Sequence, residues 1–160
     1  LLCHENQLTA LDLTHNTALA TVYCPNNRLT ALDLSKNTAL ATLACSRNQL
    51  TALDLSQNTA ITELYCNNNQ LAALDLSRNT ALTELYCNGN RLTTLDLSRN
   101  TELTKIYCDD NPLTELNISN LSKIEEIVFG DNPEINVIAN SQTVVSDEVR
   151  HYMDGKRKTP

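Results

Sequence analysis

The sequence predicts a right-handed β-solenoid, in which short strands stack coil upon coil into two parallel sheets. Three observations carry this prediction. The cysteines recur every 21 residues, and Leu-Asp-Leu triplets and two asparagine series follow the same step. A fixed period of about 20 to 50 residues is typical of repeat proteins, in which stacked units share one core. The cysteines are Cys3, Cys24, Cys45, Cys66, Cys87 and Cys108.

One unit contains two strand patterns. The unit that begins at Leu64 reads LYCNNNQLAALDLSRNTALTE. Apolar residues alternate with others around Tyr65 and again around Asp75, which is the mark of a strand with one buried face. Asparagines follow both triplets and predict turns. Each unit is therefore expected to supply two short strands, and no run of helical periodicity reaches two turns.

The two asparagine series predict structural ladders. An inward-facing Asn side chain donates to and accepts from backbone groups of its own and adjacent coils. Leu121 replaces the next expected asparagine of the second series, so we expect the regularity to loosen near residue 120. The series are Asn6, Asn27, Asn48, Asn69, Asn90, Asn111 and Asn132, and Asn16, Asn37, Asn58, Asn79 and Asn100.

The repeat pattern LxxLxCxxNxLxxLDLSxNTA resembles that of internalin-like leucine-rich-repeat proteins of bacterial surfaces, which have 21-residue repeats. The resemblance implies a leucine-rich-repeat solenoid over residues 1–139, with six units and a degraded seventh. It also implies a non-enzymatic binding module at the bacterial cell surface or outside the cell. The partner is then a host or cell-surface protein, with a glycan as the alternative and a structural spacer as a third possibility.

The two ends depart from the repeat. The chain starts inside a strand without a polar cap, so we expect that further units precede it in the parent protein. Residues 140–160 are predicted to form a cap and tail. Ser146 is a suitable N-cap for a short helix that ends before Gly155. The final Lys-Arg-Lys-Thr-Pro is expected to fray.

Composition argues against several partners. The formal net charge of −7 and the pI near 4.8 disfavour nucleic acid and anionic membranes. No apolar stretch approaches the roughly 18 residues of a membrane span, so direct insertion is not expected. No charged leader is visible at the start of the sequence, which does not bear on where the mature protein is found.

The cysteines are interpreted as core residues. Each occupies an inward place in its triplet, where a thiol behaves as a small hydrophobe. Zinc sites of the common kind need closer spacing, and no histidine is in phase with the cysteines. A catalytic thiol needs a base and some exposure. We therefore predict no catalytic residues, no metal site and no cofactor.

A row of aspartates is predicted to face solvent. Carboxylates stacked about 4.8 Å apart repel one another, so we expect raised pKa values. A serine or threonine two residues further on is placed to donate hydrogen bonds that offset this repulsion. The alternative, a row of Ca²⁺ sites, is disfavoured because calcium wants about 6–8 oxygen ligands. The row is Asp12, Asp33, Asp54, Asp75 and Asp96.

The tyrosine row is the predicted binding site. Aromatic rings held on a rigid sheet offer large contact area at low entropic cost. The alternatives are cross-strand stacking that only stabilises the sheet, and a set of platforms for sugars. Charged residues lie two places earlier on the same face, and the turns that follow vary in sequence. The predicted partner-binding residues are Tyr23, Tyr65, Tyr86, Tyr107, Glu63, Glu84 and Lys105.

Overall fold

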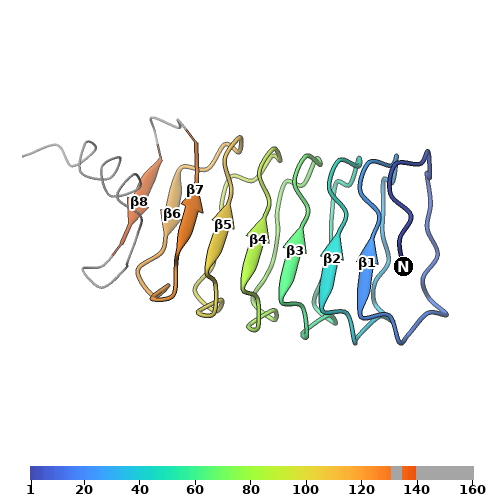
Figure 1. Cartoon of the computed structure of the whole chain (residues 1–160). Coiled ribbons are helices and arrows are strands. Elements are labelled where there is room, and N and C mark those ends of the chain that lie inside the picture. The colour runs from blue at the N-terminus through green and yellow to red at the C-terminus, as the bar shows by residue number, and fades with distance from the viewer. Residues whose placement is uncertain (131–134, 140–160) are drawn as a thin grey trace, which may run out of the picture.

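The chain forms a solenoid with a parallel sheet along one side (Figure 1). The computed structural model describes residues 1–130 and 135–139. The main sheet has the strand order β1-β2-β3-β4-β5-β7, and β6 pairs with β8 in a second sheet. The strands are β1 (Thr21–Tyr23), β2 (Thr42–Ala44), β3 (Glu63–Tyr65), β4 (Glu84–Tyr86), β5 (Lys105–Tyr107), β6 (Glu115–Asn117), β7 (Glu126–Val128) and β8 (Asn136–Ile138).

The register of the main sheet reproduces the sequence repeat. Each residue pairs with the residue 21 places further on, so Leu64 lies opposite Leu43 and Leu85. Like positions therefore stack into rows that run along the solenoid. Three-residue strands alternate, so the central residue of each is buried and its neighbours face outward. This confirms the predicted solenoid of parallel strands.

The second sheet has fewer strands than the sequence pattern predicts. It contains only β6 and β8 among the described residues, whereas the pattern predicts one such strand in every unit. The Leu-Asp-Leu triplets of the first five units make no strand pairs. Side-chain bridges satisfy their carbonyls instead. The carbonyl of Leu34, for example, accepts hydrogen bonds from the Asn37 N–H and from Asn58 Nδ2. A backbone group that is already paired in this way does not need a strand neighbour.

The expected C-terminal cap and its helix, which would begin at Ser146, lie outside the described residues. Within residues 1–130 and 135–139 there is no helix long and apolar enough to cross a membrane.

The core is a column of leucine, isoleucine and cysteine side chains. Five of the six cysteines are buried, and all six are free thiols. Burial raises the pKa of Cys66 to about 12, because a thiolate loses its hydration inside an apolar core. Burial raises the pKa of Cys45 well above its ordinary value in the same way. The structure thus confirms the inward placement predicted for the cysteine row.

We expect the buried thiols to be unreactive in the folded protein. Thiol exchange requires an accessible thiolate, and the buried cysteines offer neither access nor ionisation at neutral pH. Cys3 is partly exposed and is expected to react first. Kinetics with a chromogenic disulfide reagent should show one fast thiol per chain, with the other five released only in denaturant. A Cys3→Ala variant should lose the fast phase. Several fast thiols in that variant would contradict the buried column.

The first asparagine series ties each coil to the preceding one. Asn69 Nδ2 donates to the carbonyls of Cys45 and Cys66, each at 3.0 Å. Its Oδ1 accepts the N–H of Leu50 at 3.0 Å. Equivalent bonds recur at the other buried members of the series, which are Asn27, Asn48, Asn90 and Asn111.

The second asparagine series bridges coils at the Leu-Asp-Leu side. Asn79 Nδ2 donates to the carbonyls of Leu55 and Asn58 in the preceding coil. At the next place after Asn100, Leu121 is fully buried and supplies no bridge. The adjacent Asn120 donates instead to the Ser98 carbonyl at 2.8 Å. The regularity thus changes near residue 120, as the sequence predicts.

Candidate binding face

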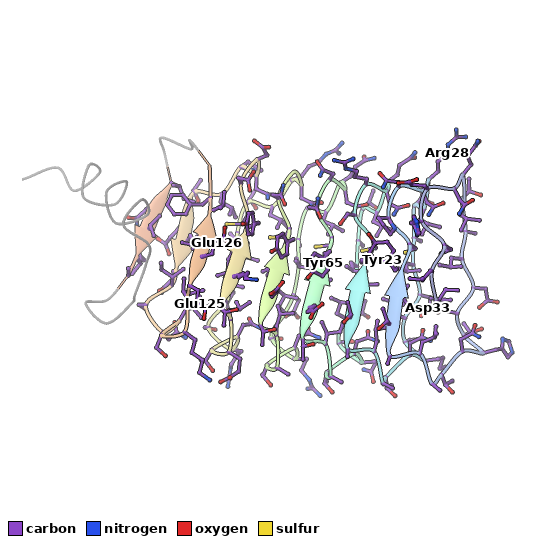
Figure 2. All side chains as sticks on the ribbon, viewed as in Figure 1. Tyr23, Arg28, Asp33, Tyr65, Glu125 and Glu126 are labelled. Carbon is purple, nitrogen blue, oxygen red and sulfur yellow. The ribbon has the colours of Figure 1, made fainter. Side chains whose placement is uncertain are left out.

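The predicted tyrosine row lies on the outward face of the main sheet, which we call the strand face. Tyr65 pairs with Tyr86, and Tyr86 with Tyr107, on the adjacent strands β3, β4 and β5. The alternation of the strands turns Leu64 inward and leaves Tyr65 outward and half-buried. Figure 2 shows Tyr23, Tyr65 and Glu126 over this sheet.

Three of the tyrosines form a continuous stack. The ring centroids of Tyr65 and Tyr86 are 4.8 Å apart, with an angle of 24° between the planes. Those of Tyr86 and Tyr107 are 4.5 Å apart, with an angle of 12°. These stacked rings cover one another's inner faces. The edges and hydroxyls of the stack, and the outer faces of its two end rings, are what a partner would meet.

Tyr23 stands apart from this stack. Ala44 occupies the intervening place on β2, so no ring links Tyr23 to Tyr65. Tyr23 is 40% exposed and makes an edge-on contact with His4, with ring centroids 5.4 Å apart. The predicted site therefore divides into a group over β3–β5 and a separate tyrosine on β1.

The charged residues of the predicted site lie beside the stack and bond to it. Lys105 Nζ is 2.8 Å from Glu84 Oε1. The Tyr65 hydroxyl donates to Glu84 Oε2 at 3.0 Å and lies 3.5 Å from Glu63 Oε2. The Lys105 hydrogen bond lowers the pKa of Glu84, so this carboxylate stays charged. Glu84 on β4 thus bonds to β3 and to β5 and links all three strands that carry the stack.

Glu126 on β7 also belongs to this group, although we did not predict it as a site residue. The Tyr107 hydroxyl donates to its carboxylate. In the sequence, the signal was its place one repeat after Lys105, a residue with which it pairs in the sheet. The hydroxyl of Tyr86 has no hydrogen-bond partner among the described residues, which makes it the unengaged hydroxyl of the stack.

Ionisation of Tyr107 should report on this arrangement. Its hydrogen bond to Glu126 raises the pKa from the ordinary 10.0 to about 12, because ionisation would place two negative charges side by side. Between these pH values the folded state keeps a proton that the unfolded state has lost. The resulting stabilisation is complete below pH 10 and is lost as the pH rises towards 12. Ultraviolet titration of wild type and Tyr107→Phe checks this: the variant should lose one transition near pH 12. An unchanged titration curve would contradict the assignment.

The aspartate row is exposed, as predicted, but our expectation of raised pKa values was wrong. In each case the pKa is lowered, because the residue two places on donates hydrogen bonds to the carboxylate. The Ser56 N–H, for example, donates to Asp54 Oδ1 at 2.9 Å. These bonds outweigh the repulsion from neighbouring aspartates, which is weak in water. The predicted serine and threonine donors are thus present, and within the described part of the chain no group of three or more His, Cys, Asp or Glu residues is placed to hold a metal ion.

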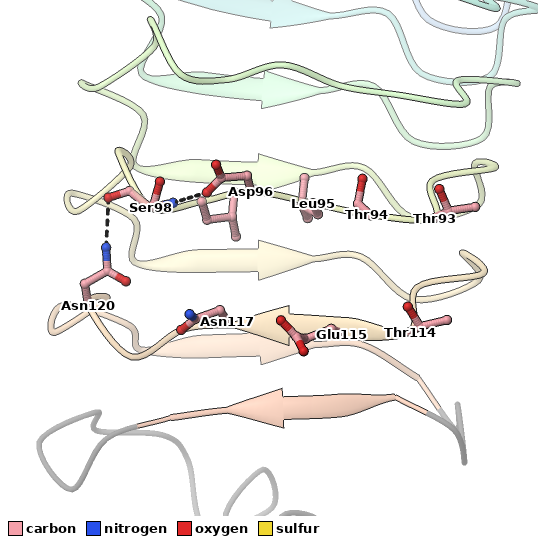
Figure 3. Close-up of a pocket in the computed structure, with 10 residues that line it drawn as sticks. Thr93, Thr94, Leu95, Asp96, Ser98, Thr114, Glu115, Asn117 and Asn120 are labelled. Atoms are coloured by element: carbon pink, nitrogen blue, oxygen red, sulfur yellow. Dashed lines mark hydrogen bonds between the residues drawn. The ribbon is translucent and has the colours of Figure 1, made fainter.

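A groove of about 280 Å³ lies on the aspartate side, where the second asparagine series ends (Figure 3). The corresponding space three units earlier is about 60 Å³. The wide groove lies along β6 and next to Asn120, which precedes the position where Leu121 replaces the bridging asparagine. Sequence reasoning predicted the irregularity but not the cavity. The lining residues are Thr93, Thr94, Leu95, Asp96, Leu97, Ser98, Thr114, Glu115, Asn117 and Asn120.

The variable turns beside the strand face share one backbone feature. These turns are residues 25–26, 46–47, 67–68, 88–89 and 109–110. The second residue of each has a positive φ, as at Arg47 (52°), Gly89 (63°) and Asp110 (52°). A Cβ at Gly89 would lie 2.7 Å from Asn68 Oδ1, so the turn is also tight. These turns hold a fixed backbone course while their side chains vary, which suits a rim that is adapted to a partner.

Comparison with known proteins supports the repeat assignment. A family model of leucine-rich repeats, described as two copies, matches residues 59–100. No curated protein sequence matches the chain. Among solved structures, the functional domain of InlJ from Listeria monocytogenes, which includes a cysteine ladder, is 34% identical with a TM-score of 0.85. The match covers 88% of this chain and 32% of that domain.

Two further structures share the architecture. YopM, a leucine-rich effector protein from Yersinia pestis, is 27% identical over 85% of this chain and 38% of its own, with a TM-score of 0.75. A leucine-rich-repeat protein from Leptospira interrogans is 21% identical over 97% of this chain and 46% of its own, with a TM-score of 0.81, and shows the fold alone. The chain thus spans less than half the length of each of these proteins. Together with the cysteine ladder and the 21-residue register, these matches show that the chain is a leucine-rich-repeat solenoid that resembles the InlJ domain.

Proposed function

We propose that the chain is a non-enzymatic module that recognises a protein partner through the strand face of β3–β5. The observation that carries the proposal is the stack of Tyr65, Tyr86 and Tyr107 on a sheet with a fixed register. Aromatic side chains on a rigid scaffold lose little entropy on binding, and tyrosine is enriched at protein interfaces. We infer from the resemblance to InlJ and YopM that the parent protein acts at the bacterial surface or after secretion.

The stack is also a source of sheet stability, so its role in binding needs a direct test. Wild-type protein and a Tyr65→Ala/Tyr86→Ala/Tyr107→Ala variant would be immobilised and exposed to host-cell surface proteins. The control carries Asp33→Ala/Asp54→Ala/Asp75→Ala on the aspartate side. Circular dichroism would first confirm that each variant folds. We expect one or more proteins to be held by wild type and the control but lost by the tyrosine variant. Capture that survives in the tyrosine variant would overturn the placement.

A glycan is the second candidate, and one observation favours the groove rather than the tyrosines for it. The inner ring faces of the stack are covered, whereas the groove offers hydroxyl, amide and carboxylate groups above an apolar floor. Asp96 and Asn120 already bond to Ser98 in this lining (Figure 3). Such mixed polar groups suit a hydroxyl-rich ligand.

A polysaccharide panel tests the second candidate. Wild type would be compared with Asp96→Ala/Asn117→Ala in the wide groove. The matched control is Asp33→Ala/Asp54→Ala, which changes equivalent positions at the smaller space. Glycan retention lost only in the groove variant would support this site. Retention lost only in the tyrosine variant would place the glycan on the strand face instead.

A further inference from the structure

Acidic groups outnumber basic ones on the strand face. The row beside the tyrosines reads Glu63, Glu84, Lys105 and Glu126 along β3, β4, β5 and β7. Asp109 and Asp110 follow Tyr107 in the next turn. This leaves five carboxylates and one ammonium around the stack, and the ammonium is already paired with Glu84.

The carboxylates differ in how well the protein satisfies them. Glu84 has both Lys105 and the Tyr65 hydroxyl as partners. Asp109, in contrast, has a buried Oδ1 with no hydrogen-bond partner. Burial raises the pKa of Asp109 above its ordinary value, and the charge of Asp110 adds to this rise. A partly desolvated carboxylate without a counter-charge gains more from a nearby cation than an exposed one does.

The Tyr107 end of the stack is where these features meet. Tyr107 has Tyr86 on one side and the smaller Val128 on the other, so its outer face is not covered by another ring. Glu126 bonds to its hydroxyl, and the negative charge of Asp109 acts on it as well. Asp109 packs against Gly130, where an added Cβ would come within 3.1 Å of the Asp109 Cβ. An aromatic face flanked by two carboxylates is a site for a cation.

We propose that the partner presents a lysine- or arginine-bearing segment, and that its cation binds at the Tyr107 end between Glu126 and Asp109. The inference rests on the proposed function and names the chemistry of the partner. An arginine guanidinium fits best, because it stacks on an aromatic face and bonds to carboxylates at its edge. The net charge of −7 favours the same partner at longer range.

A synthetic peptide provides the probe. It contains four arginines separated by Gly-Ser spacers, and its control replaces each arginine with the neutral isostere citrulline. Binding is followed by anisotropy of a labelled peptide and by protein tyrosine emission, because the chain has no tryptophan. We expect saturable binding of the arginine peptide that weakens with added salt, a change in tyrosine emission, and weaker binding of the citrulline peptide.

Matched variants locate the binding. Asp109→Asn/Glu126→Gln and Asp54→Asn/Asp75→Asn remove the same charge from opposite sides of the solenoid. We expect about tenfold weaker binding in the first pair and little change in the second, because only the first removes contacts with the cation. Equal weakening in both pairs, or absence of saturable binding, would overturn the inference.

The two proposals can fail separately. If a captured protein is lost by the tyrosine variant but bound equally by Asp109→Asn/Glu126→Gln and at high salt, the basic-partner inference is wrong and the proposed face stands. If the tyrosine variant keeps the captured protein, the proposed face itself is wrong.

Discussion

Replacing Asn69 with alanine is expected to lower the free energy of unfolding by about 4 kcal/mol. The substitution leaves the N–H of Leu50 without a partner. It also removes one of the two side-chain hydrogen bonds to each of the carbonyls of Cys45 and Cys66, which keep the bonds donated by Asn48 and Asn90. A buried N–H left unpaired costs about 1–3 kcal/mol, and each of the two lost carbonyl bonds adds about 0.5–1.5 kcal/mol.

Urea unfolding followed by circular dichroism measures this loss. Asn120→Ala is the matched control, because Asn120 is exposed and makes one side-chain bond, to the Ser98 carbonyl. We expect the control to cost about 0.5 kcal/mol. Asn69→Asp should be at least as harmful as alanine, because a carboxylate keeps the acceptor for Leu50 but sets a negative charge against two carbonyls. A small effect at Asn69 would mean that the ladder contributes little.

Leu64→Ala is expected to cost about 3.5 kcal/mol, whereas Tyr65→Ala, at the adjacent position, should cost about 1 kcal/mol. Leu64 is fully buried in β3, and its removal leaves a cavity between Leu43 and Leu85. Tyr65 is half-buried on the opposite face and loses mainly ring stacking and the bond to Glu84.

Thermal and urea unfolding of these two variants checks the alternation directly. Leu64→Met is the control, since a side chain of similar volume should cost less than about 1.5 kcal/mol. Comparable losses at positions 64 and 65 would contradict the assignment of one inward and one outward residue. The small expected cost at Tyr65 also matters for the binding experiments, because a tyrosine variant must fold before its lost binding can be interpreted.

The sequence predicts the solenoid well because the repeat keeps a constant length of 21 residues and because stacked units must bury the same face of each strand. Alternation around Tyr65 fixes which face is buried, and a step of 21 residues places Tyr65, Tyr86 and Tyr107 on neighbouring strands. It also predicts the disturbance near Leu121. The extent of the second sheet is harder to predict, because Asn58 satisfies the Leu34 carbonyl through its side chain and this competes with strand pairing.

The details of the candidate site depend on geometry that the pattern does not contain. The repeat places the tyrosines in one row but does not say that their rings stack face to face, nor that Ala44 separates Tyr23 from them. The lowered aspartate pKa values depend on hydrogen bonds at 2.9 Å such as that from Ser56 to Asp54. The spacing of the aspartates predicts mutual repulsion and therefore raised pKa values. It does not show that nearby N–H and O–H donors stabilise the carboxylates more than this repulsion destabilises them.

The asparagine ladders give the solenoid a direction. Asn69 reaches back to Cys45 and Leu50, and Asn79 reaches back to Leu55, so each coil depends on the following coil for part of its backbone hydrogen bonding. A coil that opens breaks backbone bonds to both of its neighbours, such as those from the Cys45 N–H to the Tyr65 carbonyl and from the Thr62 N–H to the Ala41 carbonyl. The groups that lose an asparagine bridge, such as the Leu50 N–H, lie only in the coil before it. Local opening should therefore spread more readily towards lower residue numbers than towards higher ones.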